Sequence, residues 1–177
     1  MAVILLTGMP GAGKEEFIKI AKRKDFAIIR MGDVVREQAK MADLNFEHES
    51  IGEFANRERE EHHEGIWADR TLSKVQEDKT LIDGVRSPIE LNIFRAELEK
   101  EAPIVAIHSS PETRFKRLRD RDREDAPKNY DEFQERDQRE LDWGIGRVIA
   151  RADHMIVNEE SLSEFRAACE DLLNKIA

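Results

Sequence analysis

A glycine-rich segment that ends in a lysine is the part of the sequence best suited to chemistry. It reads Gly8-Met9-Pro10-Gly11-Ala12-Gly13-Lys14 and matches the GxxxxGK pattern between an apolar run and a helical stretch. Glycines permit positive φ angles, so successive backbone N–H groups can point toward one phosphate chain, and the lysine can reach the β- and γ-phosphates. A simple strand-to-helix turn would not explain the lysine. We therefore expect an ATP site formed by Gly8, Met9, Pro10, Gly11, Ala12, Gly13 and Lys14, with Lys14 also catalytic.

Two acidic residues follow this lysine, where the common pattern has a serine or threonine that binds Mg²⁺. Glu15 could supply an oxygen to Mg²⁺, directly or through water, or its charge could favour the first turn of the helix. The sequence leaves both interpretations open. We expect Glu15 and Glu16 to belong to the nucleotide site, with Glu15 as a candidate metal ligand.

Two further apolar runs end in charged residues. Asp83 closes one of them, and ligands of parallel α/β sheets bind at the carboxyl ends of the strands. Asp83 is therefore predicted to be catalytic and to bind metal, by holding a Mg²⁺ water or accepting a proton, although it could merely cap the turn before Gly84. Asp33 should cap a helix at the same edge. Asp33, Arg36 and Arg86 are predicted to bind the substrate. The two arginines should bind its phosphate by paired hydrogen bonds.

A basic segment crosses this otherwise acidic chain. Residues 114–123 contain five arginines and one lysine, part of which could form a solvated helix face. Mobile arginines can neutralise the charge that spreads over a transferred phosphoryl group. The sequence therefore predicts that Arg117, Arg121 and Arg123 are catalytic and that Arg119 contacts the nucleotide.

A later helical stretch carries Arg136 and Arg139, three residues apart on one face, and both are predicted to bind the substrate. His62 and His63 lie in a charged stretch that has no third ligand at metal spacing, so we expect an exposed helix face there. Trp67 and Trp143 are expected to pack rather than to stack on a ligand.

The elements that must position these residues alternate between strands and helices. Short apolar runs at residues 3–7, 26–31, 80–83, 104–108 and 154–157 predict an α/β fold with a five-stranded parallel sheet. Helices should start at three Ser-x-x-Glu patterns, which begin at Ser87, Ser109 and Ser161. The last helix presents an apolar stripe of Leu162, Phe165, Cys169, Leu172 and Ile176. We expect one domain over residues 1–177.

Composition excludes several classes of protein. The formal net charge is −9, with 38 acidic and 29 basic residues in 177, which opposes general binding to nucleic acid. The opening apolar run is about six residues long, too short for a membrane span, so no membrane association is expected. The single Cys169 suits a reducing compartment and a packed core position, and the expected location is the cytoplasm.

Three motifs together resemble a known family. The glycine-rich segment, Gly32-Asp33-Val34-Val35-Arg36 and Asp83-Gly84-Val85-Arg86 resemble the P-loop nucleoside-monophosphate kinases, adenylate kinase in particular. Ala152-Asp153-His154-Met155-Ile156-Val157-Asn158 instead resembles the end of dephospho-CoA kinases, which implies that Asn158 lies near the ATP adenine. The archaeal UPF0200 family combines these features with segments similar to residues 135–141 and 144–146, and the chain resembles it over essentially its whole length.

The resemblance implies a P-loop NTPase core with an acceptor-binding helical arm at residues 45–78 and a short lid at residues 119–129. It also implies ATP and Mg²⁺ as cofactors. We expect an ATP-dependent phosphotransferase acting on a small nucleotide or nucleotide-like acceptor, as a monomer or homodimer. The alternative is an ATP-hydrolysing switch that acts on a macromolecular partner.

Overall fold

A parallel five-stranded sheet forms the centre of the chain, as the apolar runs predict. The computed structural model describes residues 2–42, 50–98, 102–120 and 126–176. Its strands are β1 (Ala2–Thr7), β2 (Ala27–Arg30), β3 (Lys79–Asp83), β4 (Ile104–His108) and β5 (His154–Val157). They run in the order β2-β3-β1-β4-β5, and every pairing is parallel. Each strand falls within two residues of its predicted position, because buried parallel strands are near-continuous apolar runs.

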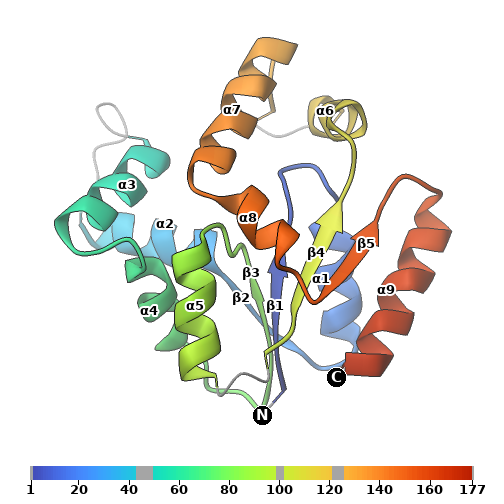
Figure 1. The fold of residues 1–177 in the computed structure, drawn as a ribbon, viewed down its shortest axis with the longest axis horizontal. Coiled ribbons are helices and arrows are strands. Elements are labelled where there is room, and N and C mark those ends of the chain that lie inside the picture. Colours follow the sequence, from blue (N-terminus) through green and yellow to red (C-terminus); the bar gives the residue numbers. More distant parts are fainter. Residues whose placement is uncertain (1, 43–49, 99–101, 121–125, 177) are drawn as a thin grey trace.

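Helices cover both faces of this sheet and stand over one of its ends (Figure 1). They are α1 (Lys14–Arg23), α2 (Met31–Met41), α3 (Ile51–Glu61), α4 (Ile66–Leu72), α5 (Pro88–Glu97), α6 (Pro111–Arg119), α7 (Tyr130–Asp142), α8 (Ile145–Ala150) and α9 (Leu162–Ile176). Helices α6 and α7 lie above the carboxyl ends of the strands (Figure 1). Among the described residues, no helix is both long and apolar enough to cross a membrane.

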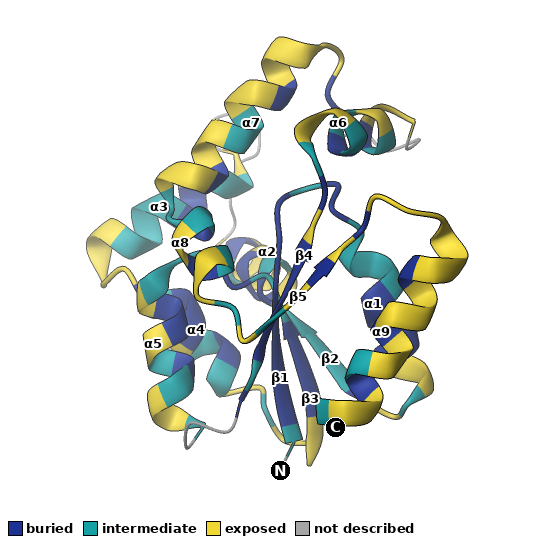
Figure 2. Cartoon of the chain, turned by 45° about the vertical axis from the view of Figure 1, so that its right-hand side comes forward, coloured by how far each residue is buried: buried dark blue, intermediate teal, exposed yellow. Residues whose placement is uncertain are grey.

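Alternation along β1 divides the core into two layers. Val3 and Leu5 point into a cluster shared with α2, α3, α4, α5 and α8, whereas Ile4 and Leu6 point into a cluster shared with α1 and α9. Such alternation follows from the two-residue period of a strand. Because both faces of β1, β3 and β4 are covered, the middle of the sheet is the most buried part of the molecule (Figure 2). The loop that follows β1 therefore grows from a rigid support.

Two of the three predicted helix caps are confirmed and one is wrong by a residue. Ser87 with Glu90 forms a reciprocal capping box at the start of α5, and Ser161 accepts the backbone N–H of Glu164 before α9. Helix α6 is capped by Ser110, which accepts the backbone N–H of Thr113. Ser109 is buried instead, and its hydroxyl donates to the carbonyl of Ala12 in the glycine-rich segment.

The apolar stripe of α9 is confirmed at its centre and wrong at one end. Phe165 and Cys169 are buried against the sheet, as predicted, and Leu173 rather than Leu172 completes the fully buried set. Leu162 is 51% exposed, since it is the first residue of the helix and extends past the edge strand β5. The stripe thus begins one turn later than the spacing suggests.

The predicted arm at residues 45–78 contains α3 and α4, although residues 43–49 lie outside the described residues. Helix α4 belongs to the core as much as to any arm, because Trp67 and Ala68 are buried in the layer below α2 and α5. The Trp67 indole N–H donates to the carbonyl of Ala55 on α3, 3.1 Å away, which confirms its packing role. Of the predicted lid at residues 119–129, residues 121–125 lie outside the described part.

The reactivity of Cys169 shows whether α9 packs on the sheet. Burial raises the pKa of the Cys169 thiol to about 12, so about one thiol in ten thousand is ionised at pH 8. We predict that iodoacetamide does not alkylate Cys169 of the folded protein at pH 8, as measured by mass spectrometry. The protein unfolded in urea should react at the rate of a free thiol. Equal rates in both states would contradict the predicted packing of α9.

Candidate active site

The glycine-rich loop between β1 and α1 curls around the side chain of its own lysine. Gly8, Gly11 and Gly13 have φ angles of 144°, 82° and 109°, a region that favours glycine. The Lys14 ammonium donates to the carbonyl oxygens of Gly8 at 2.5 Å and Met9 at 3.4 Å. Helix α1 begins at Lys14, so its N-terminus opens directly onto the loop. This arrangement suits the binding of a phosphate chain.

Residues from distant parts of the chain hold the outside of this loop. The side-chain amide of Asn158 donates to the carbonyl of Ala12 at 2.8 Å, and the Ser109 hydroxyl lies 3.2 Å from the same oxygen. Arg117 donates to the Ser109 hydroxyl and to the Asn158 carbonyl. Arg117 and Asn158, predicted to contact the nucleotide or its transferred phosphate, therefore lie behind the loop, where they support its shape.

Arg114 connects the loop to α7. Its guanidinium donates to the carbonyls of Pro10 and Ser109, both at 3.2 Å, and forms a two-point ion pair with Asp137 on α7. Arg114 is 4% exposed, so water screens this ion pair little. In the sequence, Arg114 is one arginine of a basic segment, and its spacing does not distinguish it from the neighbouring arginines.

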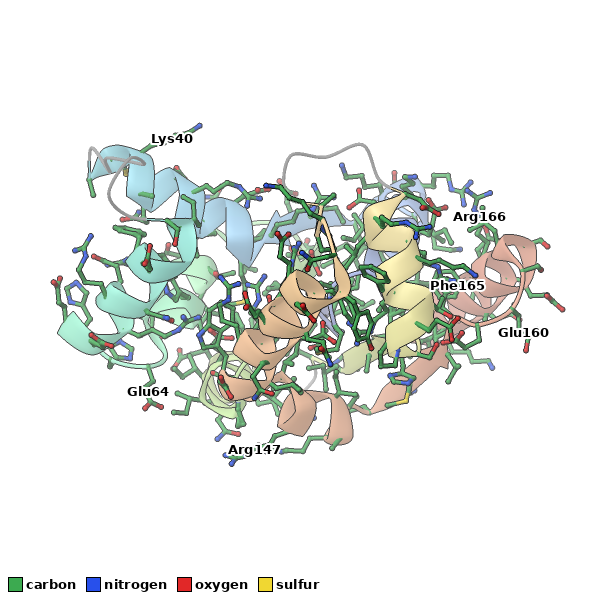
Figure 3. The ribbon with its side chains drawn as sticks, turned by 90° about the horizontal axis from the view of Figure 1, so that it is seen from above. Lys40, Glu64, Arg147, Glu160, Phe165 and Arg166 are labelled. Atoms are coloured by element: carbon green, nitrogen blue, oxygen red, sulfur yellow. The ribbon has the colours of Figure 1, made fainter. Side chains whose placement is uncertain are left out.

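A charged cavity of about 340 Å³ opens beside the loop, at the carboxyl ends of β1, β2 and β3. Figure 3 looks down on this end of the sheet, with α7 crossing the middle between α2 and α3 on one side and α6 on the other. The charged side chains that line the cavity are Lys14, Glu15, Arg30, Asp33, Arg36, Asp83, Arg86, Arg136 and Glu140. The structure thus brings together residues that the three sequence motifs place far apart in the chain.

Asp83 ends β3 with one oxygen that lacks a partner. Its Oδ1 atom is buried and makes no hydrogen bond within the described part of the chain. Burial raises the pKa of Asp83, while the charges of Lys14, Arg86 and Arg30 act in the opposite direction. An orphaned carboxylate oxygen beside Glu15 fits a hard cation or its water. The described residues contain no cluster of three His, Cys, Asp or Glu side chains that could hold a metal ion, so phosphate or water oxygens would complete such a site.

Glu15 has a partner that the sequence did not suggest. Its two carboxylate oxygens lie 2.8 and 2.9 Å from one guanidinium nitrogen of Arg30, at the end of β2. Glu16 points elsewhere, since hydrogen bonds from Lys19 and from Arg166 on α9 bind its carboxylate and lower its pKa. The structure therefore does not bring Glu16 to the cavity. Figure 3 labels Arg166 on α9, at the side of the molecule away from α2 and α3.

Two carboxylates orient Arg86 toward the cavity. Its Nε donates to Glu140 on α7 at 2.9 Å, and its backbone N–H donates to Glu90 on α5 at 2.8 Å. Burial alone would lower the pKa of Arg86, but the charges of Glu140, Glu90 and Asp83 outweigh it and raise that pKa. The guanidinium is therefore charged, and Glu140 occupies its Nε edge.

The second predicted substrate arginine is more exposed. Arg36 donates to Asp33 at 2.6 Å, and their side chains are 56% and 58% exposed. Asp33 is not the helix cap that the sequence predicts, because α2 begins two residues earlier, at Met31, immediately after β2. Asp33 lies in the first turn and orients Arg36 instead.

The other arginines that were predicted to belong to the site lie in three different places. Arg136 and Arg139 on α7 line a wider cavity of about 590 Å³ between α2, α3 and α7, and Arg136 also reaches the smaller charged cavity. Arg119 ends α6 exposed, with its guanidinium on the neighbouring Asp120, and is not brought to the loop. Arg121 and Arg123 lie outside the described residues.

Trp143 forms the side wall of the wider cavity. Its ring lies under the guanidinium groups of Arg59, at 5.2 Å, and Arg86, at 5.8 Å, and its N–H donates to Asn56. It therefore packs, as predicted, but against residues of the candidate site. His62 and His63 are exposed, as expected, and lie near Glu58 and Asp69.

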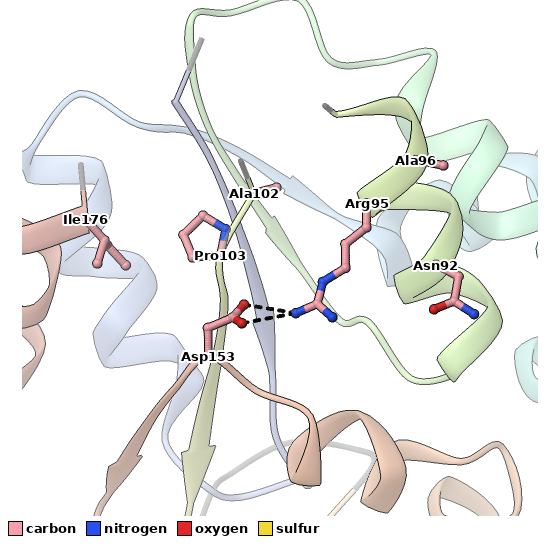
Figure 4. Close-up of a pocket in the computed structure, with 7 residues that line it drawn as sticks. All are labelled: Asn92, Arg95, Ala96, Ala102, Pro103, Asp153 and Ile176. Carbon is pink, nitrogen blue, oxygen red and sulfur yellow. Dashed lines mark hydrogen bonds and ion pairs between the residues drawn. The ribbon is translucent and has the colours of Figure 1, made fainter. Parts of the chain in front are cut away.

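A separate cavity of about 760 Å³ lies at the opposite end of the sheet (Figure 4). Arg95 and Asp153 form an ion pair at its wall, 3.0 Å apart, and Asp153 also accepts the backbone N–H of Ile104. Ligands of parallel α/β sheets bind at the carboxyl ends of the strands, and this cavity lies at the other end. Its polar residues join α5 to the start of β4, which is a structural role.

Comparison with known proteins decides the family. A UPF0200 protein of Thermoplasma acidophilum is 47% identical over 175 residues, which cover 98% of this chain and 96% of the relative. A UPF0200 protein of Methanothermobacter thermautotrophicus is 43% identical over 183 residues, covering 100% of this chain and 92% of the relative. The chain belongs to the UPF0200 family. The predicted family is therefore confirmed.

Two broader comparisons agree on the architecture of this UPF0200 protein. The family model described as an AAA domain matches residues 7–134. The crystal structure of shikimate kinase from Bacteroides thetaiotaomicron superimposes with a TM-score of 0.71 at 16% identity, covering 99% of this chain and 98% of that chain. The structure of TT1252 from Thermus thermophilus gives a TM-score of 0.63 at 14% identity, covering 99% and 98%. At these identities the likeness shows the fold, a P-loop kinase-like core.

The close approach of β4 to the loop generates a prediction about Gly8. A Cβ atom at Gly8 would collide with the backbone carbonyl of Ile107, and its φ of 144° strains any other residue. Gly8→Ala should therefore cost about 1–3 kcal/mol of unfolding free energy and weaken ATP binding. Urea unfolding and calorimetric titration measure the two effects.

Gly146→Ala is the matched control. Gly146 lies inside α8 without a positive φ, and a Cβ there would meet Leu141 at an ordinary 3.4 Å. This variant should be as stable as the parent or more stable by about 0.4–1 kcal/mol, with unchanged ATP binding. Equal stability of the two variants would refute the tight packing of the loop on β4.

Proposed function

We propose that this UPF0200 protein transfers the γ-phosphoryl group of ATP to a small acceptor that already carries a phosphate. The observation that carries the proposal is a cavity of about 140 Å³ lined by Lys14, Arg30, Arg36, Asp83 and Arg86. Donor-side and acceptor-side charges thus meet in a space that has room for phosphate groups. The P-loop kinase-like fold supports a small-molecule kinase in general.

Each side of this cavity suits one half of the reaction. Lys14 and the N-terminus of α1 suit the β- and γ-phosphates of ATP, and a bound Mg²⁺ would supply charge neutralisation beside Asp83 and Glu15. Arg36 and Arg86 suit the phosphate of the acceptor, since guanidinium groups bind phosphate by two parallel hydrogen bonds. The wider cavity beside α3 and α7 has room for the rest of the acceptor.

In the proposed reaction, an acceptor oxygen attacks the γ-phosphorus atom of ATP; it is a phosphate oxygen in a nucleoside monophosphate and a hydroxyl in a dephospho-CoA-like acceptor. A new oxygen–phosphorus bond forms, the bond to the β-phosphate oxygen breaks, and ADP leaves. Where the attacking group is a hydroxyl, its proton passes to the Asp83 carboxylate; an ionised phosphate oxygen has no proton to transfer. Lys14 neutralises charge on the transferred group.

We propose that the acceptor is a nucleotide or nucleotide-like molecule, such as a nucleoside monophosphate or dephospho-CoA. A coupled assay of ADP release over nucleoside monophosphates and dephospho-CoA tests this. Turnover that needs one of these acceptors supports the proposal. Steady ATP hydrolysis without any acceptor, or only with a protein partner, would favour an ATP-hydrolysing switch instead.

The first prediction for this function concerns Lys14. Lys14→Ala should fold normally and lose about 10²-fold or more in turnover, because one positioned donor to developing phosphoryl charge contributes about 3 kcal/mol. Circular dichroism establishes the folding and the ADP-release assay the rate. A correctly folded variant with near-normal turnover would remove Lys14, and with it the phosphate loop, from the chemistry.

The second prediction assigns Arg36 and Arg86 to the acceptor. Lysine keeps their charge but cannot reproduce the guanidinium fork, so Arg36→Lys and Arg86→Lys should each raise the acceptor KM by about tenfold or more. ATP affinity, titrated without acceptor, should stay within a few-fold of the parent. Arg95→Lys, in the ion pair at the opposite end of the sheet, is the matched control and should change neither value. Weakened ATP binding with an unchanged acceptor KM would move both arginines to the donor site.

A further inference from the structure

Arg30 neutralises the carboxylate that stands where the common P-loop pattern has a hydroxyl. A single nitrogen of Arg30 lies within 2.9 Å of both oxygens of Glu15, and the two side chains are 31% and 40% exposed. Both line the charged cavity with Lys14 and Asp83. The pair is therefore open to water and ligand, and its partners can separate without breaking a packed core.

The pairing of Glu15 with Arg30 changes the charge that the phosphates of a nucleotide would meet. Glu15 follows Lys14 directly, so its charge lies beside the place that the loop offers to the phosphates. Like charges a few ångströms apart near a protein surface repel strongly enough to change an affinity by an order of magnitude. Without Arg30, Glu15 would oppose the binding of a triphosphate unless a cation neutralised it.

Asp83 lies in the same cavity as Glu15 and offers a second carboxylate to a cation. Arg30 and Asp83 are register partners in adjacent strands, and both line the same cavity as Glu15. The buried Oδ1 atom of Asp83 makes no hydrogen bond among the described residues. A divalent cation that arrives with the phosphates would find an oxygen of Asp83 and an oxygen of Glu15 in the same cavity.

We propose that Glu15 and Arg30 form an exchangeable pair that sets how strongly nucleotide binding depends on divalent metal. Arg30 holds Glu15 in the metal-free site. When nucleotide binds with Mg²⁺, Glu15 leaves Arg30 for the cation or its water shell. The inference rests on the proposed binding of ATP.

Calorimetric titration with a non-hydrolysable ATP analogue tests the pair, once with Mg²⁺ and once with a chelator. The quantity compared is the metal dependence, the ratio of the metal-free Kd to the Kd with Mg²⁺. Arg30→Gln leaves Glu15 uncompensated, so its metal-free Kd should rise about tenfold while its Kd with Mg²⁺ stays near the parent value. Glu15→Gln removes the repelling charge and should give a metal dependence below that of the parent.

A variant that carries both Glu15→Gln and Arg30→Gln distinguishes the proposed exchange of Glu15 between Arg30 and the cation from the simple loss of the ion pair. Because Arg30 acts through Glu15, Glu15→Gln with Arg30→Gln should show the low metal dependence of Glu15→Gln alone. Arg23→Gln and Glu170→Gln break a matched ion pair between α1 and α9, at 3.2 Å, and should leave the ratio unchanged. Thermal melts of every variant check that the fold is intact.

Two outcomes overturn different statements. An unchanged ratio in both Arg30→Gln and Glu15→Gln, with normal nucleotide binding, overturns the exchange and leaves the proposed kinase in place. A folded parent protein that binds no nucleotide, with or without Mg²⁺, overturns the proposed function itself.

Discussion

The shape of the phosphate loop depends on hydrogen bonds that reach its outer carbonyls from the far half of the chain. Asn158 after β5 and Ser109 after β4 both bind the carbonyl of Ala12, and Arg114 on α6 binds that of Pro10. Buried carbonyl groups need hydrogen-bond partners, and these side chains supply them for Pro10 and Ala12. The partners come from the segments that follow β4 and β5, the two strands on one side of β1, so the sheet order brings them to the loop.

Arg114 extends this support to the opposite wall of the cavity. Through its buried ion pair with Asp137 it fixes α7, and α7 carries Arg136 and Glu140, which line the charged cavity. The glycine-rich loop and the α7 wall of the cavity are therefore attached to one guanidinium group. Breaking one partner of such a buried pair is strongly destabilising, which keeps the two halves of the site in a fixed relation.

The sequence predicted the parts of this site whose signal is local. The sheet, the loop and Asp83 could be predicted because apolar runs, glycine spacing and a strand-end carboxylate each follow from neighbouring residues. The pairing of charged side chains could not be predicted from the sequence. Glu15 pairs with Arg30, fifteen residues away, and Arg86 pairs with Glu140, fifty-four residues away, and only the packing of α1 beside β2 and of α7 above β3 decides either contact.

Arg117 and Asn158 illustrate the same limit in the opposite direction. Their residue types suit contact with a nucleotide, but the buried hydroxyl of Ser109 and the outer carbonyls of the loop need hydrogen-bond partners, and these two side chains provide them. A spacing pattern predicts which residues reach one end of the sheet. It does not predict which of them are required there to satisfy buried backbone groups.

Charge balance in the cavity bears on which acceptor it can accept. Arg30, Arg36 and Arg86 are each held by a carboxylate, respectively Glu15, Asp33 and Glu140. Glu140 takes the Nε edge of Arg86, so a ligand can use the other edge without breaking that pair, and exposed Arg36 can turn from Asp33 at little cost. A phosphate dianion offers both the charge and the paired oxygens that draw these groups inward. A neutral alcohol offers neither, so the arginines would stay on their carboxylates, and this difference favours an acceptor that already bears phosphate.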